Sequence, residues 1–167
     1  MDFPLQNIIL NIAILIVEDN PDDVSVFKAV LSVGNTYQNT ILSFKVFDVD
    51  NIDDAKLPLN GSINNNTKFD LILLDLNLKG FTDLNEIENF VQTYKSIPVI
   101  IHTEIYDLDL AFRCIRMGAQ DYLVKQFTDA SQLIHSISHS IQRHAVFNKT
   151  GDLLEKLEQE SYDHKNG

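Results

Sequence analysis

The run from Phe69 to Asp75, which reads Phe-Asp-Leu-Ile-Leu-Leu-Asp, decides the fold predicted for this chain. A short apolar run of this kind is typical of a strand buried on both faces of a parallel sheet. The same pattern occurs earlier, where the apolar run Ile12 to Val17 is followed by Glu18 and Asp19. Ligands bind at the carboxyl edge of such sheets, so both strands are expected to deliver acidic side chains to a binding edge.

Predicted strands and helices alternate along the rest of the chain. Strands are expected at 12–17, 41–47, 69–76, 97–102 and 121–124. Helices are expected at 21–31, 83–94, 108–117 and 130–147, with a short helix near 52–57. Alternation of this kind implies right-handed crossovers and a parallel sheet between two helical layers. The sequence therefore predicts an α/β, doubly wound, five-stranded parallel sheet with helices on both faces.

The bulk composition limits the classes of function. The chain has 167 residues, 44% of them apolar, and a net charge of −11. Nucleic acids and anionic membranes both attract a basic surface, so neither is an expected partner. The single cysteine, Cys114, excludes an internal disulfide and fits a reducing, cytoplasmic location. We expect an N-terminal extension at 1–11, one domain at 12–147 and a polar tail or short helix at 148–167.

Reactive side chains follow the predicted strands. Glu18 and Asp19 follow the first strand, Asp75 ends the third, Thr103 follows the fourth and Lys125 follows the fifth. Several acids cannot share a small pocket as bare anions, so either they retain protons or a cation lies among them. Mg²⁺ favours such oxygen ligands.

These residue types suit phosphoryl transfer. A carboxylate nucleophile such as Asp75 can accept a phosphoryl group as an acyl phosphate. Lys125 and a metal ion would offset charge on the transferring oxygens. The Thr103 hydroxyl can donate a hydrogen bond to one of those oxygens.

At this point the chain resembles the receiver domain of two-component response regulators, the CheY-like superfamily. The matching segments are Ile14–Pro21, Leu73–Leu76, Pro98–Thr103 and Gly118–Lys125, and the resemblance covers about residues 12 to 147. It implies a flavodoxin-like (βα)5 fold and a signalling role rather than an enzyme. It also implies Mg²⁺-dependent phosphoryl transfer to Asp75 from a sensor histidine kinase or phosphotransfer protein.

The resemblance assigns roles to the remaining positions. Mg²⁺ would be bound by Asp19, Asp75 and the Asn77 carbonyl, with Glu18 assisting. Thr103 and Tyr122 would be the switch pair, in which the hydroxyl moves toward the phosphoryl group and the ring turns inward. The output face would be formed by the fourth helix, the fifth strand and the last helix. The same face could support a homodimer.

The chain departs from the family pattern at several positions near the acceptor. Lys79 stands where the family usually has proline, Gln126 replaces the proline after Lys125, and Glu104 replaces the small residue after Thr103. An acidic side chain at Glu104 could repel a phosphodonor. A degenerate receiver that acts as a constitutive protein-interaction module is therefore the alternative function. Function as a phospho-aspartyl hydrolase of the haloacid dehalogenase type is a remote alternative. That family has an Asp-x-Asp motif at the nucleophile, and this chain has Asn77 in place of the second aspartate.

Other features have simpler interpretations. His135 and His139 have a possible metal-ligand spacing but no evident third ligand, so a solvated or interfacial helix face is expected there. Cys114 is expected in the core. Leu153, Leu154 and Leu157 are too few to define a coiled coil by themselves.

Overall fold

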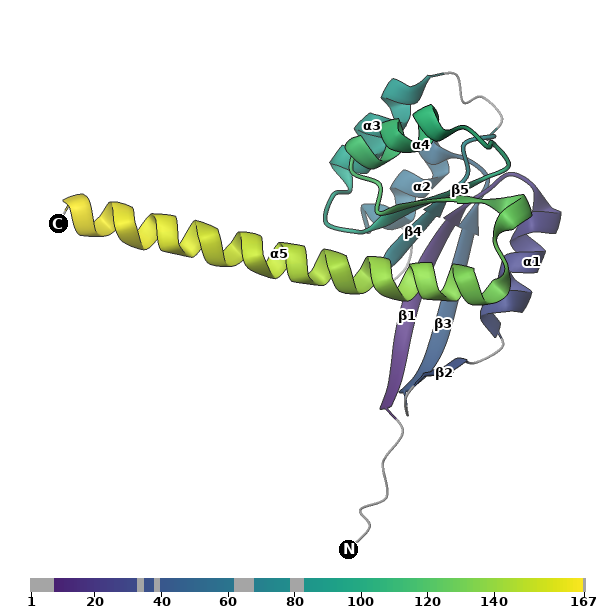
Figure 1. Ribbon diagram of the computed structural model, residues 1–167, viewed down its shortest axis with the longest axis horizontal. Coiled ribbons are helices and arrows are strands. Elements are labelled where there is room, and N and C mark those ends of the chain that lie inside the picture. The colour runs from purple at the N-terminus through teal and green to yellow at the C-terminus, as the bar shows by residue number, and fades with distance from the viewer. Residues whose placement is uncertain (1–7, 33–34, 38–39, 62–67, 79–82, 167) are drawn as a thin grey trace, which may run out of the picture.

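The computed structural model describes residues 8–32, 35–37, 40–61, 68–78 and 83–166, which form a six-stranded sheet between two helical layers (Figure 1). The strands are β1 (Ile8–Val17), β2 (Asn35–Tyr37), β3 (Thr40–Val49), β4 (Leu71–Leu74), β5 (Val99–Thr103) and β6 (Asp121–Val124). The helices are α1 (Pro21–Ser32), α2 (Ile52–Leu59), α3 (Leu84–Thr93), α4 (Leu108–Arg116) and α5 (Ala130–Asn166), with a 3₁₀ turn η1 (Lys125–Phe127).

The strand order is β2-β3-β1-β4-β5-β6. All neighbours pair in parallel except β2, which runs antiparallel to β3 at the edge of the sheet. The predicted five-stranded parallel sheet is confirmed, and β2 is an addition that the sequence did not predict. A three-residue edge strand carries too little alternation to be recognised from its residues.

The predicted strands also differ from the observed strands in length. β1 begins at Ile8, so it includes residues that were assigned to an N-terminal extension. Its pairing with β3 runs from Ile8 opposite Thr40 to Val17 opposite Val49, and β3 is equally long. β4 is shorter than predicted and covers only Leu71–Leu74.

Each face of the sheet carries its own core. One core joins the sheet to α2, α3 and α4 through buried residues that include Ala55, Ile87 and Cys114. The other joins the sheet to α1 and α5 through residues that include Phe27 and Ile137. Burying these side chains stabilises the packing of the helices on the sheet, and each Å² of apolar surface removed from water contributes about 25 cal/mol. Both layers therefore fix the carboxyl edge of the strands.

Helix α5 is longer than predicted. It runs from Ala130 to Asn166 without a break at residue 148, so the predicted boundary between domain and tail falls inside one helix. Its first half is anchored where the Ser136 hydroxyl donates to Asp121 (2.5 Å) and Arg143 donates to the Gln120 carbonyl (3.1 Å). In the part of the chain that the structure describes, no helix is both long and apolar enough to cross a bilayer.

The first prediction concerns the packing of α5. Ile137 is fully buried against the sheet, whereas Val146, two and a half turns further along the same helix, is 67% exposed. Ile137→Ala should lower the free energy of unfolding by about 2–5 kcal/mol because it leaves a cavity. Val146→Ala should change it by less than about 0.5 kcal/mol. Urea denaturation of both variants measures the difference, and equal losses would contradict the packing described here.

The second prediction concerns pH. His102 on β5 is 5% exposed, its ring packs edge-on against Phe27 at 4.9 Å, and burial lowers its pKa from 6.5 to about 4. Below pH 6.5 the unfolded chain binds a proton that the folded chain does not bind until pH falls to about 4. The free energy of unfolding should therefore fall as pH drops through this window.

The variant His102→Leu should remove this acid-dependent loss, which amounts to about 3 kcal/mol at most. Urea denaturation between pH 7 and pH 4 tests it. The exposed His135→Leu is the matched control and should keep the pH dependence of the original protein. A His102→Leu profile parallel to that of the original protein would exclude this effect.

Candidate functional site

The register of the sheet brings the predicted site residues to one edge. Val17 pairs with Leu74, so Glu18 and Asp75, the next residues of each strand, leave the sheet side by side. Thr103 pairs with Val124, which places Lys125 next to the end of β5. The carboxyl ends of β1, β4, β5 and β6 therefore form the site, as the sequence predicted.

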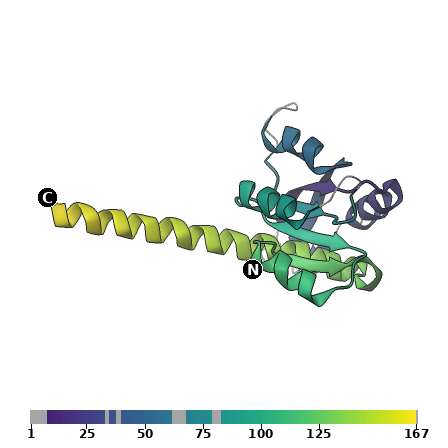
Figure 2. The same ribbon diagram turned by 90° about the horizontal axis from the view of Figure 1, so that it is seen from above.

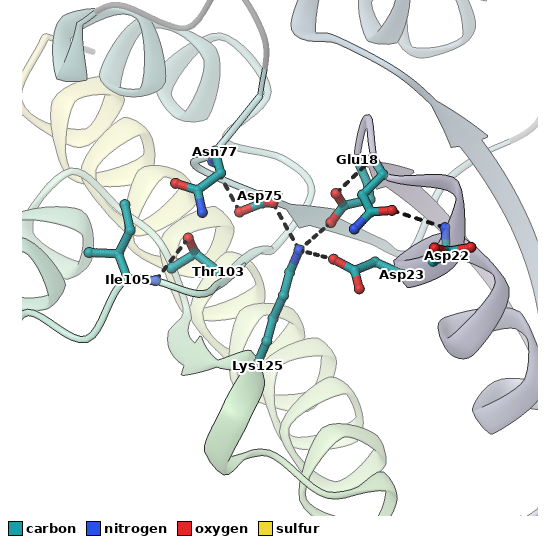
Figure 3. Close-up of polar contacts among 9 residues, drawn as sticks. Glu18, Asp22, Asp23, Asp75, Asn77, Thr103, Ile105 and Lys125 are labelled. Atoms are coloured by element: carbon teal, nitrogen blue, oxygen red, sulfur yellow. Dashed lines mark hydrogen bonds and ion pairs between the residues drawn. The ribbon is translucent and has the colours of Figure 1, made fainter.

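The Lys125 ammonium lies among three carboxylates (Figure 3). Its Nζ is 2.6 Å from Glu18 Oε2, 2.6 Å from Asp23 Oδ2 and 2.9 Å from Asp75 Oδ2. Glu18 and Asp75 are only 2% and 4% exposed. One cation thus links the ends of β1 and β4 to the first turn of α1 and to η1.

The two buried carboxylates are also held by backbone groups. The Asn77 backbone N–H donates to Asp75 Oδ1 (3.1 Å), and the Asn20 N–H donates to Glu18 Oε1 (3.1 Å). Each carboxylate therefore directs one oxygen to Lys125 and the other to the backbone two residues further on. This double attachment fixes the orientation of Asp75 before any ligand arrives.

The charges in the site are unbalanced, since three carboxylates face one ammonium. Burial raises the pKa of Glu18, the hydrogen bond from Lys125 lowers it, and the nearby Asp75 charge raises it again, with a net increase. Burial alone would lower the pKa of Lys125, but hydrogen bonds to Asp23, Glu18 and Asp75 raise it above its ordinary value. Lys125 is therefore a permanent cation, and the site retains an excess of negative charge.

Asp23 belongs to the site but was not predicted. It lies in the first turn of the helix predicted at 21–31, where acidic residues are common because they interact favourably with the helix dipole. Asp22 and Asp23 follow Glu18 and Asp19 within five residues, and this acidic cluster after the first strand was the signal available in the sequence. Its carboxylate is the third partner of Lys125.

The predicted switch residues lie beside the carboxylates. Thr103 is fully buried, and its hydroxyl oxygen accepts a hydrogen bond from the Ile105 backbone N–H (3.4 Å). The Tyr122 hydroxyl donates to the Ile105 carbonyl (2.8 Å), and burial raises the pKa of Tyr122 to about 12. Its half-buried ring packs against the core that joins the sheet to α4. Both residues therefore hold the same short loop after β5.

The donor set at this edge fits a hard cation. Carboxylates are supplied by Glu18, Asp19 and Asp75, and oxygen ligands of this kind suit Mg²⁺. Two of these carboxylates already converge on a cation, the Lys125 ammonium. Among the described residues, no group of three or more His, Cys, Asp or Glu side chains is arranged to hold a metal ion. The predicted magnesium ligands thus remain a prediction, and Lys79 lies outside the described residues.

Comparison with protein families gives one match over most of the chain. The response regulator receiver domain family matches residues 14–138. This segment contains all six strands except the first part of β1, and it contains the whole carboxylate site. It ends within α5, before the half of that helix that leaves the sheet.

Curated relatives match over part of their length. The luminescence regulatory protein LuxO of Vibrio campbellii is 31% identical over 44% of this chain, which spans only 16% of LuxO. The cell cycle transcriptional regulator CtrA of Caulobacter vibrioides is 29% identical over 54% of this chain and 40% of CtrA. The glycerol metabolism activator of Pseudomonas putida is 30% identical over 72% of this chain and 52% of that protein.

Solved structures agree with the fold. The receiver domain of a LuxO repressor protein from Vibrio parahaemolyticus has a TM-score of 0.64 and 26% identity, with 87% of this chain and 98% of that chain covered. The phosphorylated cyanobacterial phytochrome response regulator RcpA has a TM-score of 0.58 and 27% identity, with 77% and 89% covered. With the strand order and the carboxylate edge, these matches show that the chain belongs to the family of response regulator receiver domains.

Proposed function

We propose that the chain accepts a phosphoryl group on Asp75 from a partner histidine kinase or phosphotransfer protein and signals through a conformational change. The observation that carries this proposal is the fixed orientation of Asp75. Its carboxylate is held by the Asn77 N–H on one oxygen and by Lys125 on the other. A nucleophile that is already oriented loses little entropy when the phosphodonor arrives.

In the proposed reaction, the bond between phosphorus and the donor's nitrogen breaks as an Asp75 oxygen bonds to phosphorus. Lys125 lies within hydrogen-bond reach of Asp75, so its ammonium can offset charge on the phosphoryl oxygens. Glu18, Asp19, Asp75 and the Asn77 carbonyl would hold Mg²⁺. When bound, the ion would add its positive charge to that of Lys125 at an edge where three carboxylates face one ammonium.

The proposed switch needs more than one contact. A swing from 1:99 to 99:1 between two states requires about 5.5 kcal/mol, and one neutral hydrogen bond contributes about 1 kcal/mol. The Thr103 hydroxyl oxygen accepts its bond from the Ile105 N–H, so its own O–H could donate to a phosphoryl oxygen and link that oxygen to the loop after β5. Because Tyr122 holds the Ile105 carbonyl, movement of this loop would also change the packing of Tyr122.

The proposed output face consists of α4, β6 and α5. On α4, the large apolar side chains of Leu108, Phe112 and Ile115 are exposed. Nearby in the chain, Tyr106 and Phe127 form an exposed edge-to-face pair at 5.5 Å, which connects the loop after β5 to η1. A protein partner or a second copy could bind these side chains.

A constitutive interaction module is the second candidate function. One observation favours it: the Tyr122 ring is half-buried, and its hydroxyl donates a hydrogen bond to the Ile105 carbonyl, so the ring is already held against the loop after β5. If this is also the signalling conformation, the output face is formed without phosphorylation. The two candidates differ in whether Asp75 reacts at all.

The third prediction tests this difference. Incubation with Mg²⁺ and acetyl phosphate should add one phosphoryl group, detected by intact mass. Asp75→Asn and removal of Mg²⁺ with EDTA should both abolish the gain, because the first removes the nucleophile and the second removes the metal charge. Asp109→Asn, an exposed position on α4, is the control and should react normally. No gain in the original protein would support the constitutive module.

The fourth prediction concerns Glu104, which is exposed directly after Thr103. Its negative charge should repel an anionic phosphodonor by about 1 kcal/mol at short range. Glu104→Ala should therefore raise the initial rate of phosphorylation by acetyl phosphate about fivefold. Glu104→Gln separates the causes: a similar gain indicates charge repulsion, whereas no gain indicates crowding by the side chain. A rate unchanged in both variants would show that Glu104 does not limit the reaction.

A further inference from the structure

A surface hollow lies at the end of the sheet remote from the carboxylate site. Its walls come from the end of α3, the residues just before β5 and β6, and the middle of α5. Its volume is about 350 Å³, which is near the lower end of the range for small-molecule sites. Figures 1 and 2 show α5 running along the domain and then projecting from it. The hollow is therefore separated from Thr103 and Lys125 by the length of β5 and β6.

The charged side chains in this hollow are basic, although the whole chain has a net charge of −11. Lys95 and Arg143 both line it, and none of the described residues that line it is acidic. Lys95 has no hydrogen-bond or ion-pair partner within the described ranges. The lining therefore suits a negatively charged group, because hydrogen bonds between an ionised donor and an ionised acceptor are the strong ones.

Arg143 has donors to spare for such a group. Its two hydrogen bonds both come from Nη2, which donates to the Gln120 carbonyl (3.1 Å) and to the Ser140 hydroxyl oxygen (3.1 Å). A guanidinium has five N–H donors on three nitrogens, and those of Nη1 and Nε have no partner among the residues that the structure describes. Arg143 can thus hold α5 in place and bind an anion at the same time.

A buried histidine also lines the hollow. His144 is 9% exposed, and its Nε2 atom is buried with no hydrogen-bond partner in the described part of the chain. Buried polar atoms in proteins are nearly always hydrogen-bonded, so an unpaired one calls for an explanation. A ligand would provide a partner once the imidazole ring turned toward it. Binding should therefore change the surroundings of the ring nitrogens.

The rest of the lining is largely apolar. Phe147 is 76% exposed, and Val91 and Ile97 contribute further apolar side chains. A ring or a short hydrocarbon chain that covered Phe147 would remove this surface from water, which is favourable. The hollow thus combines two cations with an apolar surface, and this combination fits a molecule with an acid group at one end and an apolar body at the other.

The walls of the hollow are joined by hydrogen bonds. The Gln92 side-chain N–H donates to the Met117 carbonyl (2.7 Å), which links α3 to the end of α4. Gly118 follows with φ of +109°, and a Cβ there would lie 3.3 Å from Val91 Cγ1. Glycine is the residue that tolerates this backbone conformation, and it allows the close approach of α3. A hollow that is already formed loses little ordering entropy when a ligand binds.

We propose that this hollow binds a small organic anion, in which a carboxylate or phosphate group is attached to a ring or a short apolar body. The acid group would accept hydrogen bonds from Arg143 and His144, with Lys95 adding positive charge, and the apolar body would cover Phe147. The bound molecule would join α3 to α5. The site shares no residue with the carboxylate site around Asp75, so it stands even if the phosphorylation proposal fails.

NMR titration of the full ¹⁵N-labelled chain tests the proposal, with benzoate and phenyl phosphate as probes. At least one should shift the backbone signals of the lining residues and the imidazole nitrogen signals of His144, with a Kd of about 1 mM, as expected for a small fragment. The tighter of the two identifies the acid group. Asp75→Asn should bind equally well.

Two further probes separate the roles of charge and apolar surface. Benzamide lacks the negative charge and inorganic phosphate lacks the ring, so each should bind about tenfold more weakly than the better probe. Absence of shifts at the hollow with both benzoate and phenyl phosphate would overturn the proposal, as would equal binding of benzamide. Binding of inorganic phosphate as tight as that of phenyl phosphate would indicate an adventitious ion only, and would also overturn it.

Matched variants locate the anion contact. Lys95→Gln and Arg143→Gln should each weaken binding of the better probe about fivefold to tenfold, because each removes a positive charge from the hollow. Lys149→Gln removes an equal charge from an exposed position of α5 outside the hollow and should leave binding unchanged. Lys95→Gln breaks no contact among the described residues, so weaker binding in that variant would not reflect loss of folding. Unchanged binding in both hollow variants would exclude the site.

A last variant tests the apolar contact. Phe147→Ala should weaken binding of the better probe several-fold and leave the weak binding of inorganic phosphate unchanged, since only the ring contacts Phe147. Because Phe147 is exposed, its loss should not alter the fold, and circular dichroism checks this. Equal weakening for both probes would contradict the proposed orientation of the ligand.

Discussion

The structure of the site depends on one partly buried cation, Lys125. Lys125 bonds three carboxylates that come from the loop after β1, the first turn of α1 and the end of β4. Like-charged carboxylates would otherwise repel one another in a setting with little water. The ammonium therefore allows acidic side chains from distant parts of the sequence to share one edge of the sheet. It also holds one oxygen of Asp75 in place, as the nucleophile of the proposed reaction would require.

This arrangement has a cost for metal binding. An ion that enters the carboxylate cluster must compete with an ammonium that already occupies two of the predicted ligands. The excess of carboxylates over cations favours such an ion, while the raised pKa of Lys125 means that the competing charge cannot be relieved by deprotonation. Under the proposed function, the balance between these two cations at Glu18 and Asp75 would set how readily Asp75 reacts.

Much of the fold and the site could be predicted from the sequence because strong local patterns coincide there. Apolar runs that end in Glu18 and Asp75 define both the buried strands and the acidic edge. Asp23 was missed because acidic residues are common in the first turn of a helix. β2 was missed because three residues carry no periodic signal, and the length of α5 was missed because its second half lacks a core to face.

The continuity of α5 has a mechanical consequence. The helix is hydrogen-bonded to Asp121, the first residue of β6, and to Gln120 just before it, and β6 leads into Lys125. The part beyond His144, residues 145–166, is about 33 Å long, so a change of angle at the domain is enlarged along it. A tilt of about 5° at the domain would move the far end by about 3 Å, given this length. A small movement of η1, which carries Lys125, would therefore produce a larger displacement at the far end of α5.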